Sequence, residues 1–69
     1  MIVGWMFERG DDMAWVFLED EGAARAKATE ALAGDPTADA VMLPEGVRQF
    51  FKAGSGQVVL GRVFDRFSK

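Results

Sequence analysis

The sequence contains no histidine, no cysteine and no tyrosine among its 69 residues. Without histidine and cysteine, the chain lacks the commonest general base, the thiol nucleophile and most ligands of transition metals. Its side-chain hydroxyl groups are confined to Thr29, Thr37, Ser55 and Ser68, and without histidine a Ser-His-Asp triad is excluded. We therefore expect a protein that is not an enzyme and that binds no cofactor or metal.

Carboxylates are the remaining groups that could support acid–base chemistry or bind Mg²⁺. The candidates are clustered in sequence, and most have a simpler structural explanation: Asp11 and Asp12 are typical turn residues, while Asp20 and Glu21 are typical of a helix start. Gly54-Ser55-Gly56 is glycine-rich but lacks the lysine and the spacing of a phosphate-binding loop. We interpret it as a turn.

The sequence also lacks an apolar run near the roughly 20 residues needed to span a bilayer, and no signal-peptide pattern follows Met1. We therefore expect a complete cytoplasmic protein, in the host cytoplasm if a phage encodes it, and no contact with a membrane. With 49% hydrophobic and 28% charged residues, the composition predicts one globular domain over residues 1–69. A domain this small without disulfides or metals depends on packing or on association, so a bound partner or a homodimer is an open alternative.

Acidic and basic residues are distributed unevenly along the chain. Residues 1–45 contain ten acidic and three basic residues, a net charge of −7, whereas residues 46–69 contain one acidic and five basic residues, a net charge of +4. Neither half has a long run of like charges of the kind that marks an interaction tail. We interpret the asymmetry as two oppositely charged, solvated faces of one fold.

The first twenty residues predict a β-hairpin. Residues 2–8 and 13–19 are rich in Val, Ile, Trp, Phe and Met, and the stretch between them, Arg9-Gly10-Asp11-Asp12, is composed of turn formers. Arg9-Gly10-Asp11 also spells an adhesion tripeptide, which on a cytoplasmic chain we interpret as a hairpin tip.

A helix is predicted over residues 21–33, where Ala, Glu, Lys, Arg and Leu predominate. Asp20 suits the N-cap, Glu21 places negative charge in the first turn, and Gly34, followed by Asp35-Pro36, ends the helix. Its predicted buried stripe, at the spacing of one helix face, consists of Ala24, Ala28, Ala31 and Leu32. These side chains are mostly methyl groups, so the helix can lie close to the surface it covers.

The rest of the chain predicts two more strands and a short helix. Residues 39–43 suit a third strand, and Pro44 suits the first position of a second helix that runs to Gly54. Residues 57–67 alternate as a final strand. The order strand-strand-helix-strand-(short helix)-strand predicts an α+β fold, a small single-layer sheet of four strands with one main helix packed on one face.

The length of the hairpin loop decides which side chains share a face of the sheet, because a shift of one residue moves the set to the other face. A two- or four-residue loop pairs Phe7 with Ala14 and Trp5 with Val16, so each face mixes large and small side chains. A three-residue loop pairs Phe7 with Trp15 and Trp5 with Phe17. We favour the three-residue loop, since it leaves a flat aliphatic face for the alanine-rich helix: Ile2, Gly4, Met6, Ala14, Val16 and Leu18, joined by Val59, Gly61 and Val63.

The opposite face would then be aromatic and partly basic. The partner-binding residues predicted on it are Trp5, Phe7, Trp15, Phe17, Arg62, Phe64 and Arg66, with Val3, Val58 and Leu60 beside them. Within the chain, only the segment 45–53, with Phe50 and Phe51, can cover this face. Either that segment and the loops form a second small core, or part of the face stays open as an interface, for which Trp, Phe, Met and Arg are typical.

Three functions remain as hypotheses. The favoured one is a small non-enzymatic protein-interaction module that inhibits or regulates a larger protein partner. In size, acidity and absence of catalytic side chains it resembles phage and plasmid inhibitors and antitoxins, anti-CRISPR proteins among them, although no motif carries the resemblance. The alternatives are a single-stranded nucleic-acid binder, disfavoured by a pI near 4.7, and a homo-oligomeric structural protein. An acidic surface could also imitate DNA phosphates on a basic partner: Glu19, Asp20, Glu21, Asp35 and Asp39.

Overall fold

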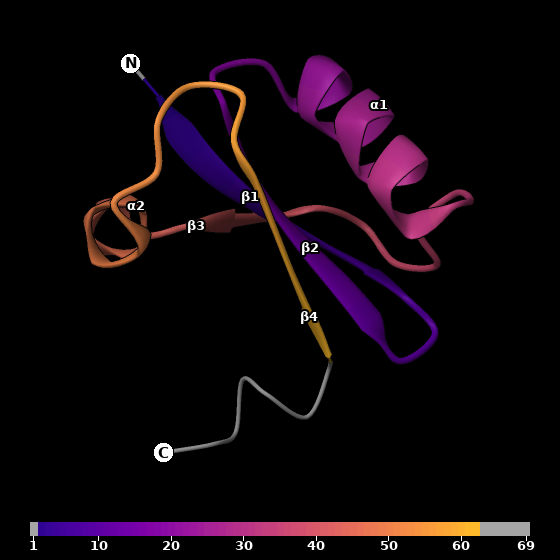
Figure 1. Cartoon of the computed structure of the whole chain (residues 1–69). Helices are drawn as coiled ribbons and strands as arrows, with labels where there is room; N and C mark the ends of the chain where they lie inside the picture. The colour runs from indigo at the N-terminus through magenta and orange to yellow at the C-terminus, as the bar shows by residue number, and fades with distance from the viewer. Residues whose placement is uncertain (1, 63–69) are drawn as a thin grey trace.

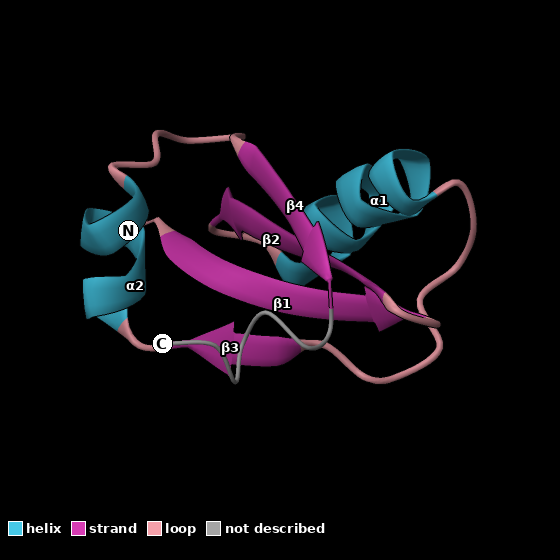
Figure 2. Cartoon of the chain, turned by 60° about the horizontal axis from the view of Figure 1, so that its bottom comes forward, coloured by secondary structure: helices cyan, strands magenta, loops and turns pink. Residues whose placement is uncertain are grey.

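A computed structural model of the chain describes residues 2–62. The sheet has four strands in the order β3-β1-β2-β4, and all neighbouring strands are antiparallel. The two helices lie on opposite sides of the sheet (Figure 1, Figure 2). The elements are β1 (Val3–Arg9), β2 (Asp12–Leu18), α1 (Glu21–Leu32), β3 (Val41–Leu43), α2 (Glu45–Phe51) and β4 (Val58–Arg62). The predicted α+β fold, with its element order and its main helix on one sheet face, is confirmed.

The hairpin has a two-residue loop, Gly10-Asp11, closed by the pair Arg9 and Asp12. Gly10 has a φ of 60° and Asp11 has a negative φ. A type II′ turn requires this combination, with the positive φ at the first loop residue. Trp5 therefore pairs with Val16 and Phe7 with Ala14. The favoured three-residue loop is wrong and the two-residue alternative is correct, because a glycine at the first loop position allows the turn whose twist matches that of the strands.

This register divides the hairpin aromatics between the two faces of the sheet. The face under α1 contributes Phe7, Ala14 and Val16 to the core, together with Ala24, Ala28 and Leu32 of the helix; Trp5, Leu18, Ala40 and Val58 pack against them. Trp15 and Phe17 alternate with these residues and face the other way. Ala14, Val16 and Leu18 were predicted under the helix correctly. The predicted positions there of Gly4, Met6, Val59 and Gly61 are wrong, as is the prediction that Val58 lies on the opposite face. The methyl groups of α1 instead accommodate the large rings of Trp5 and Phe7.

Helix α1 begins as predicted. The side chain of Asp20 accepts a hydrogen bond from the backbone N–H of Ala23 at 2.8 Å. The helix ends at Leu32, because Ala33 adopts the left-handed conformation with a φ of 60°, a position expected for Gly34. Gly34 instead lies against the guanidinium of the exposed Arg9, which would have to move to make room for a Cβ at this position. Ala31, predicted in the buried stripe, is exposed.

The second half of the chain follows the predicted order with shorter elements. β3 is confined to Val41–Leu43, and α2 ends where Lys52 adopts a φ of 54°. Residues 54–57 form a turn, as predicted, with a hydrogen bond from Gln57 N to Gly54 O of 3.2 Å and a φ of 82° at Gly56. Residues 63–67, predicted as the end of the final strand, lie outside the described residues, as do residues 1, 68 and 69.

Candidate partner-binding surface

Four aromatic side chains meet on the sheet face opposite α1. The ring of Phe51, from α2, lies 5.8 Å from that of Trp15 and 6.0 Å from that of Phe17, centroid to centroid. Phe50 contacts Phe51 edge-on at 5.4 Å, with an angle of 79° between the rings. These distances lie in the range where aromatic pairs attract each other beyond the burial of their area. We call Trp15, Phe17, Phe50 and Phe51 the aromatic cluster.

The exposure of the cluster rises from the sheet outward. Phe17 is fully buried, and Trp15 and Phe51 are half-buried. Phe50 is 82% exposed, the highest value among the exposed large hydrophobic residues of the described chain. The cluster therefore exposes the ring of Phe50 most fully, with the partly accessible rings of Trp15 and Phe51 beside it and Phe17 beneath.

Phe50 was predicted as a cover for the sheet and not as part of a surface. Helical geometry carried the missing signal: successive residues on an α-helix point about 100° apart. When Phe51 points at the sheet, Phe50 cannot do so as well. A short helix with two adjacent phenylalanines on one sheet face thus directs one of them outward.

The register removes two predicted residues from this surface. Phe7 is fully buried in the core beneath α1. Trp5 also lies on the α1 side, where it is half-buried and its indole N–H donates to the backbone oxygen of Leu18 at 3.1 Å. The prediction that these two rings share a face with Trp15 and Phe17 is therefore wrong.

The predicted basic residues are only partly described. Arg62 is exposed on β4, on the α1 side of the sheet, and its Nε lies 4.0 Å from a carboxylate oxygen of Asp12. An exposed ion pair at that distance contributes little to stability. Phe64 and Arg66 lie outside the described residues.

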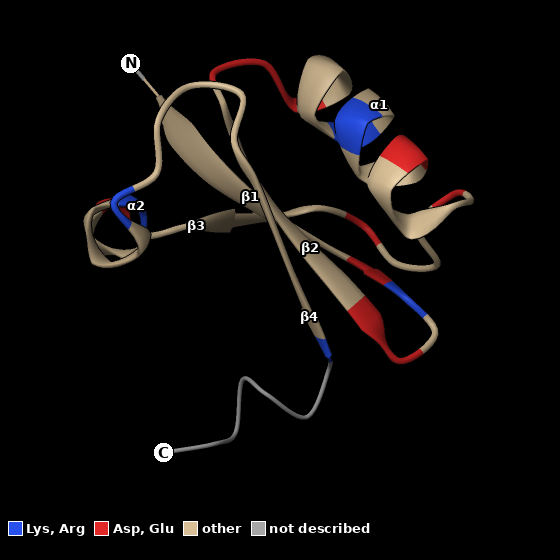
Figure 3. Cartoon of the chain, viewed as in Figure 1, with Lys and Arg blue, Asp and Glu red and all other residues tan. Residues whose placement is uncertain are grey.

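Three of the predicted acidic residues lie in the connection between β2 and the start of α1, and Asp35 and Asp39 lie exposed between α1 and β3. Glu19, Asp20 and Glu21 are all exposed there, and Asp20 is the N-cap residue. Figure 3 colours acidic residues red in this connection and at the hairpin tip, and a basic residue blue at the end of β4, which is Arg62. Arg62 from the basic half of the sequence lies beside Asp12 from the acidic half, so the oppositely charged halves meet at this end of the sheet.

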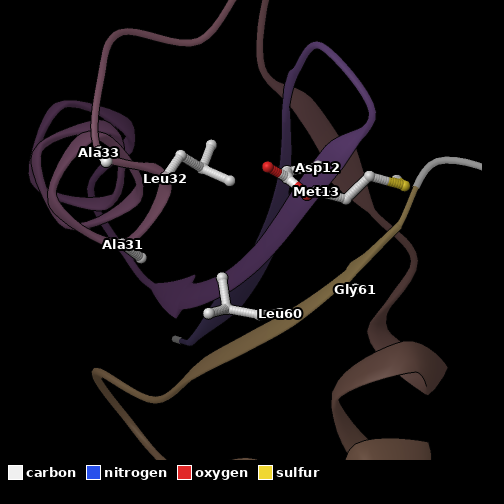
Figure 4. A pocket seen from close by; sticks show the side chains of 7 residues that line it. All are labelled: Asp12, Met13, Ala31, Leu32, Ala33, Leu60 and Gly61. Atoms are coloured by element: carbon white, nitrogen blue, oxygen red, sulfur yellow. The ribbon is translucent and has the colours of Figure 1, made fainter.

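A groove lies between the end of α1 and the strands β2 and β4. It has a volume of about 300 Å³ and is lined by Asp12, Met13, Ala31, Leu32, Ala33, Leu60 and Gly61. Leu32 and Leu60 project into the space between helix and strand, and Met13 points away from it (Figure 4). Leu60 is 59% exposed. The groove was not predicted, because the favoured register placed Leu60 on the face opposite α1.

The described side chains offer contact surfaces more clearly than reactive groups. No polar or charged side chain is buried within residues 2–62. In the same part of the chain, no group of three or more acidic side chains is arranged to hold a metal ion, and no helix has the length and hydropathy to cross a membrane.

Comparison with known proteins gives no match by any of three routes: no protein-family model, no curated protein and no solved structure is similar to the chain.

Proposed function

We propose that the chain is a small non-enzymatic protein-interaction module that inhibits or regulates a larger protein by occupying a site on it. The exposure of Phe50 supports this proposal most directly: its side chain is 82% exposed. Its ring is in edge contact with Phe51, which in turn contacts Trp15 and Phe17. Aromatic anchors of this kind are enriched at the centres of interfaces. A ring already held by neighbours also loses less side-chain entropy on binding.

We propose that the chain acts in the cytoplasm of a cell, or in that of the host if a phage encodes it. The likeness to phage and plasmid inhibitors remains one of size, acidity and missing catalytic side chains. Binding by occlusion needs no reactive group, which agrees with a sequence that has neither histidine nor cysteine.

The test compares Phe50→Ala with Met42→Ala. Met42 is also a large exposed apolar residue, 61% exposed, but it lies on β3 and on the α1 side of the sheet. Tagged wild-type protein and both variants are incubated with native extract, and retained proteins are quantified by mass spectrometry. We expect one protein that is retained by the wild type and by Met42→Ala and is reduced at least tenfold with Phe50→Ala. Equal retention by all three proteins would rule out Phe50 as the anchor.

Two further measurements address the alternatives. Among the described residues on the face opposite α1, the corrected register leaves Trp15, Phe50 and Phe51 as accessible rings for base stacking, and only Trp15 of these comes from the hairpin, which was expected to supply four. Binding of single-stranded oligonucleotides at low salt, abolished by Phe50→Ala, would replace the proposal with the nucleic-acid alternative. A stable dimer in sedimentation that Phe50→Ala converts to a folded monomer would assign the aromatic cluster to self-association.

A further inference from the structure

Within residues 2–62, the outer edge of β4 has no neighbouring strand, because β4 is the last strand of the sheet. Phe17 N donates to Gln57 O at 3.1 Å, so these two residues form a hydrogen-bonded pair between β2 and β4. In an antiparallel pair of strands, every second residue after such a pair again directs its backbone groups toward the neighbouring strand. The backbone groups of Val59 and Gly61 then point toward β2, and those of Val58 and Leu60 point outward.

The two edges of the sheet are protected to different degrees. β3 has three residues and is followed directly by Pro44, so only Met42 directs its backbone groups outward. β4 has five residues, Val58–Arg62, without proline and with a charge only at Arg62. Natural sheets usually protect an edge with charged residues, proline or a very short strand. Of the two edges that the described residues form, β4 is therefore the one less protected against pairing with another strand.

The groove lies directly beside this edge, on the α1 side. Leu60 lines it from the strand and Ala31 and Leu32 line it from the helix. Its volume of about 300 Å³ is at the lower end of the range for pockets that bind small ligands. A strand added next to β4 would place every second side chain on the α1 side, beside Leu60.

A positive charge marks one end of the groove. Lys27 extends from α1 over the turn that leads into β4, where its Cε is 3.9 Å from the position that a Cβ on Gly56 would occupy. Ala31 is one turn further along the same helix face, so Lys27 and the groove are on one side of α1. Among the described residues, the structure gives Lys27 no ion pair.

From these observations we infer that the β4 edge and the groove bind an extended segment of a partner protein by antiparallel strand addition. A large apolar side chain lies opposite Leu60 and enters the groove. The segment runs antiparallel to β4, so its residue two positions later lies opposite Val58, and an acidic side chain there faces Lys27. This binding mode combines backbone hydrogen bonds with specificity from alternate side chains, and it does not involve Phe50.

Charge favours such a segment over a second copy of this chain. In a dimer formed by two antiparallel β4 strands centred on Leu60, Arg62 of each copy would lie opposite Val58 of the other copy. Arg62 would then be on the side of the sheet where Lys27 of that other copy lies. Like charges so placed oppose pairing. An acidic residue in a partner segment is attracted at the same place.

The first test uses a synthetic seven-residue peptide with leucine at its centre, glutamate two residues later and threonine elsewhere. Binding is measured by fluorescence anisotropy, and the contact is located from backbone amide shifts in NMR spectra. We expect saturable binding with shifts in Val58–Arg62 and none in Val41–Leu43. Methylation of the central leucine amide, which removes the donor to Leu60 O, should weaken binding about tenfold. Methylation of the next amide, which points away from β4, should have little effect.

The second test uses matched variants of the protein. Leu60→Lys should reduce binding at least tenfold, whereas Met42→Lys, at an equally exposed site on the other edge strand, should not change it. Lys27→Glu should weaken binding of the glutamate peptide and strengthen binding of the same peptide with lysine in that position. If Lys27 had only a structural role, Lys27→Glu would not reverse the preference for the glutamate peptide over the lysine peptide.

The inference is overturned if the peptide does not bind, if both methylated peptides bind equally well, or if Lys27→Glu leaves the charge preference unchanged. It is also overturned if sedimentation shows a dimer that Leu60→Lys dissociates, because the edge would then belong to a second copy. Loss of extract binding by Phe50→Ala with peptide binding intact would separate this site from the one in the proposed function.

Discussion

The ring of Phe51 on α2 lies 5.8 Å from the ring of Trp15 on β2. This contact joins the short second helix to the hairpin on the face that α1 does not cover, and it leaves Phe50 pointing to solvent. The two adjacent phenylalanines therefore have different roles, Phe51 in the fold and Phe50 at the surface.

Replacement of the two phenylalanines should separate these roles. We expect Phe51→Ala to lower the free energy of unfolding by about 2 kcal/mol, since a half-buried ring loses contacts with Trp15 and Phe17. Phe50→Ala should change it by less than about 0.5 kcal/mol. Urea unfolding followed by tryptophan fluorescence measures both. Equal losses would mean that Phe50 is also part of the packed core.

Two glycines provide a test of the register. A Cβ on Gly4 would lie 2.9 Å from Cε1 of Phe17, its cross-strand partner, whereas a Cβ on Gly46 would meet nothing within 4 Å. Gly4→Ala should therefore destabilise the protein by about 1–3 kcal/mol through overpacking. Gly46→Ala in α2 should be neutral or stabilising by up to about 1 kcal/mol. A tolerated Gly4→Ala would contradict the close approach of Phe17 to β1.

The left-handed residue at the end of α1 offers a stabilising substitution. Ala33 has a φ of 60°, which glycine adopts without the steric cost of a Cβ. We expect Ala33→Gly to raise the free energy of unfolding by about 0.5–1 kcal/mol. Ala26→Gly, which puts glycine at an exposed position inside the helix, should lower the free energy of unfolding by about 1 kcal/mol. Thermal unfolding followed by circular dichroism compares the two, and a loss of stability in both would refute the assigned helix end.

The N-cap of α1 should depend on an oxygen acceptor in the side chain of residue 20. Asp20→Ala removes the acceptor for Ala23 N and should destabilise the protein by about 1 kcal/mol. Asp20→Asn keeps an oxygen acceptor and should remain within about 0.5 kcal/mol of the wild type. If both variants lose the same stability, the charge of Asp20 matters more than its hydrogen bond.

The candidate surface was only partly predictable, for reasons that differ between residues. Phe50 was recognisable as part of the short helix, but its outward direction depends on which of two adjacent rings meets Trp15. The groove beside Leu60 depends on the pairing of Leu60 with Ala14, which places it on the α1 side. A different hairpin register moves such a residue to the other face without any change in local composition.

The helices and strands and their order could be predicted from the sequence, because they depend mainly on neighbours along the chain. Asp20 begins α1, alanines at helical spacing form its buried side, and Gly10 permits the tight turn of the hairpin. The positions of the aromatic rings became clear only from the three-dimensional packing: Trp5 and Phe7 lie beneath α1, whereas Trp15 and Phe17 contact Phe51. Both faces of the hairpin are apolar, so hydrophobicity alone does not choose between registers. The turn geometry and the fit of large rings against a helix of methyl groups make that choice.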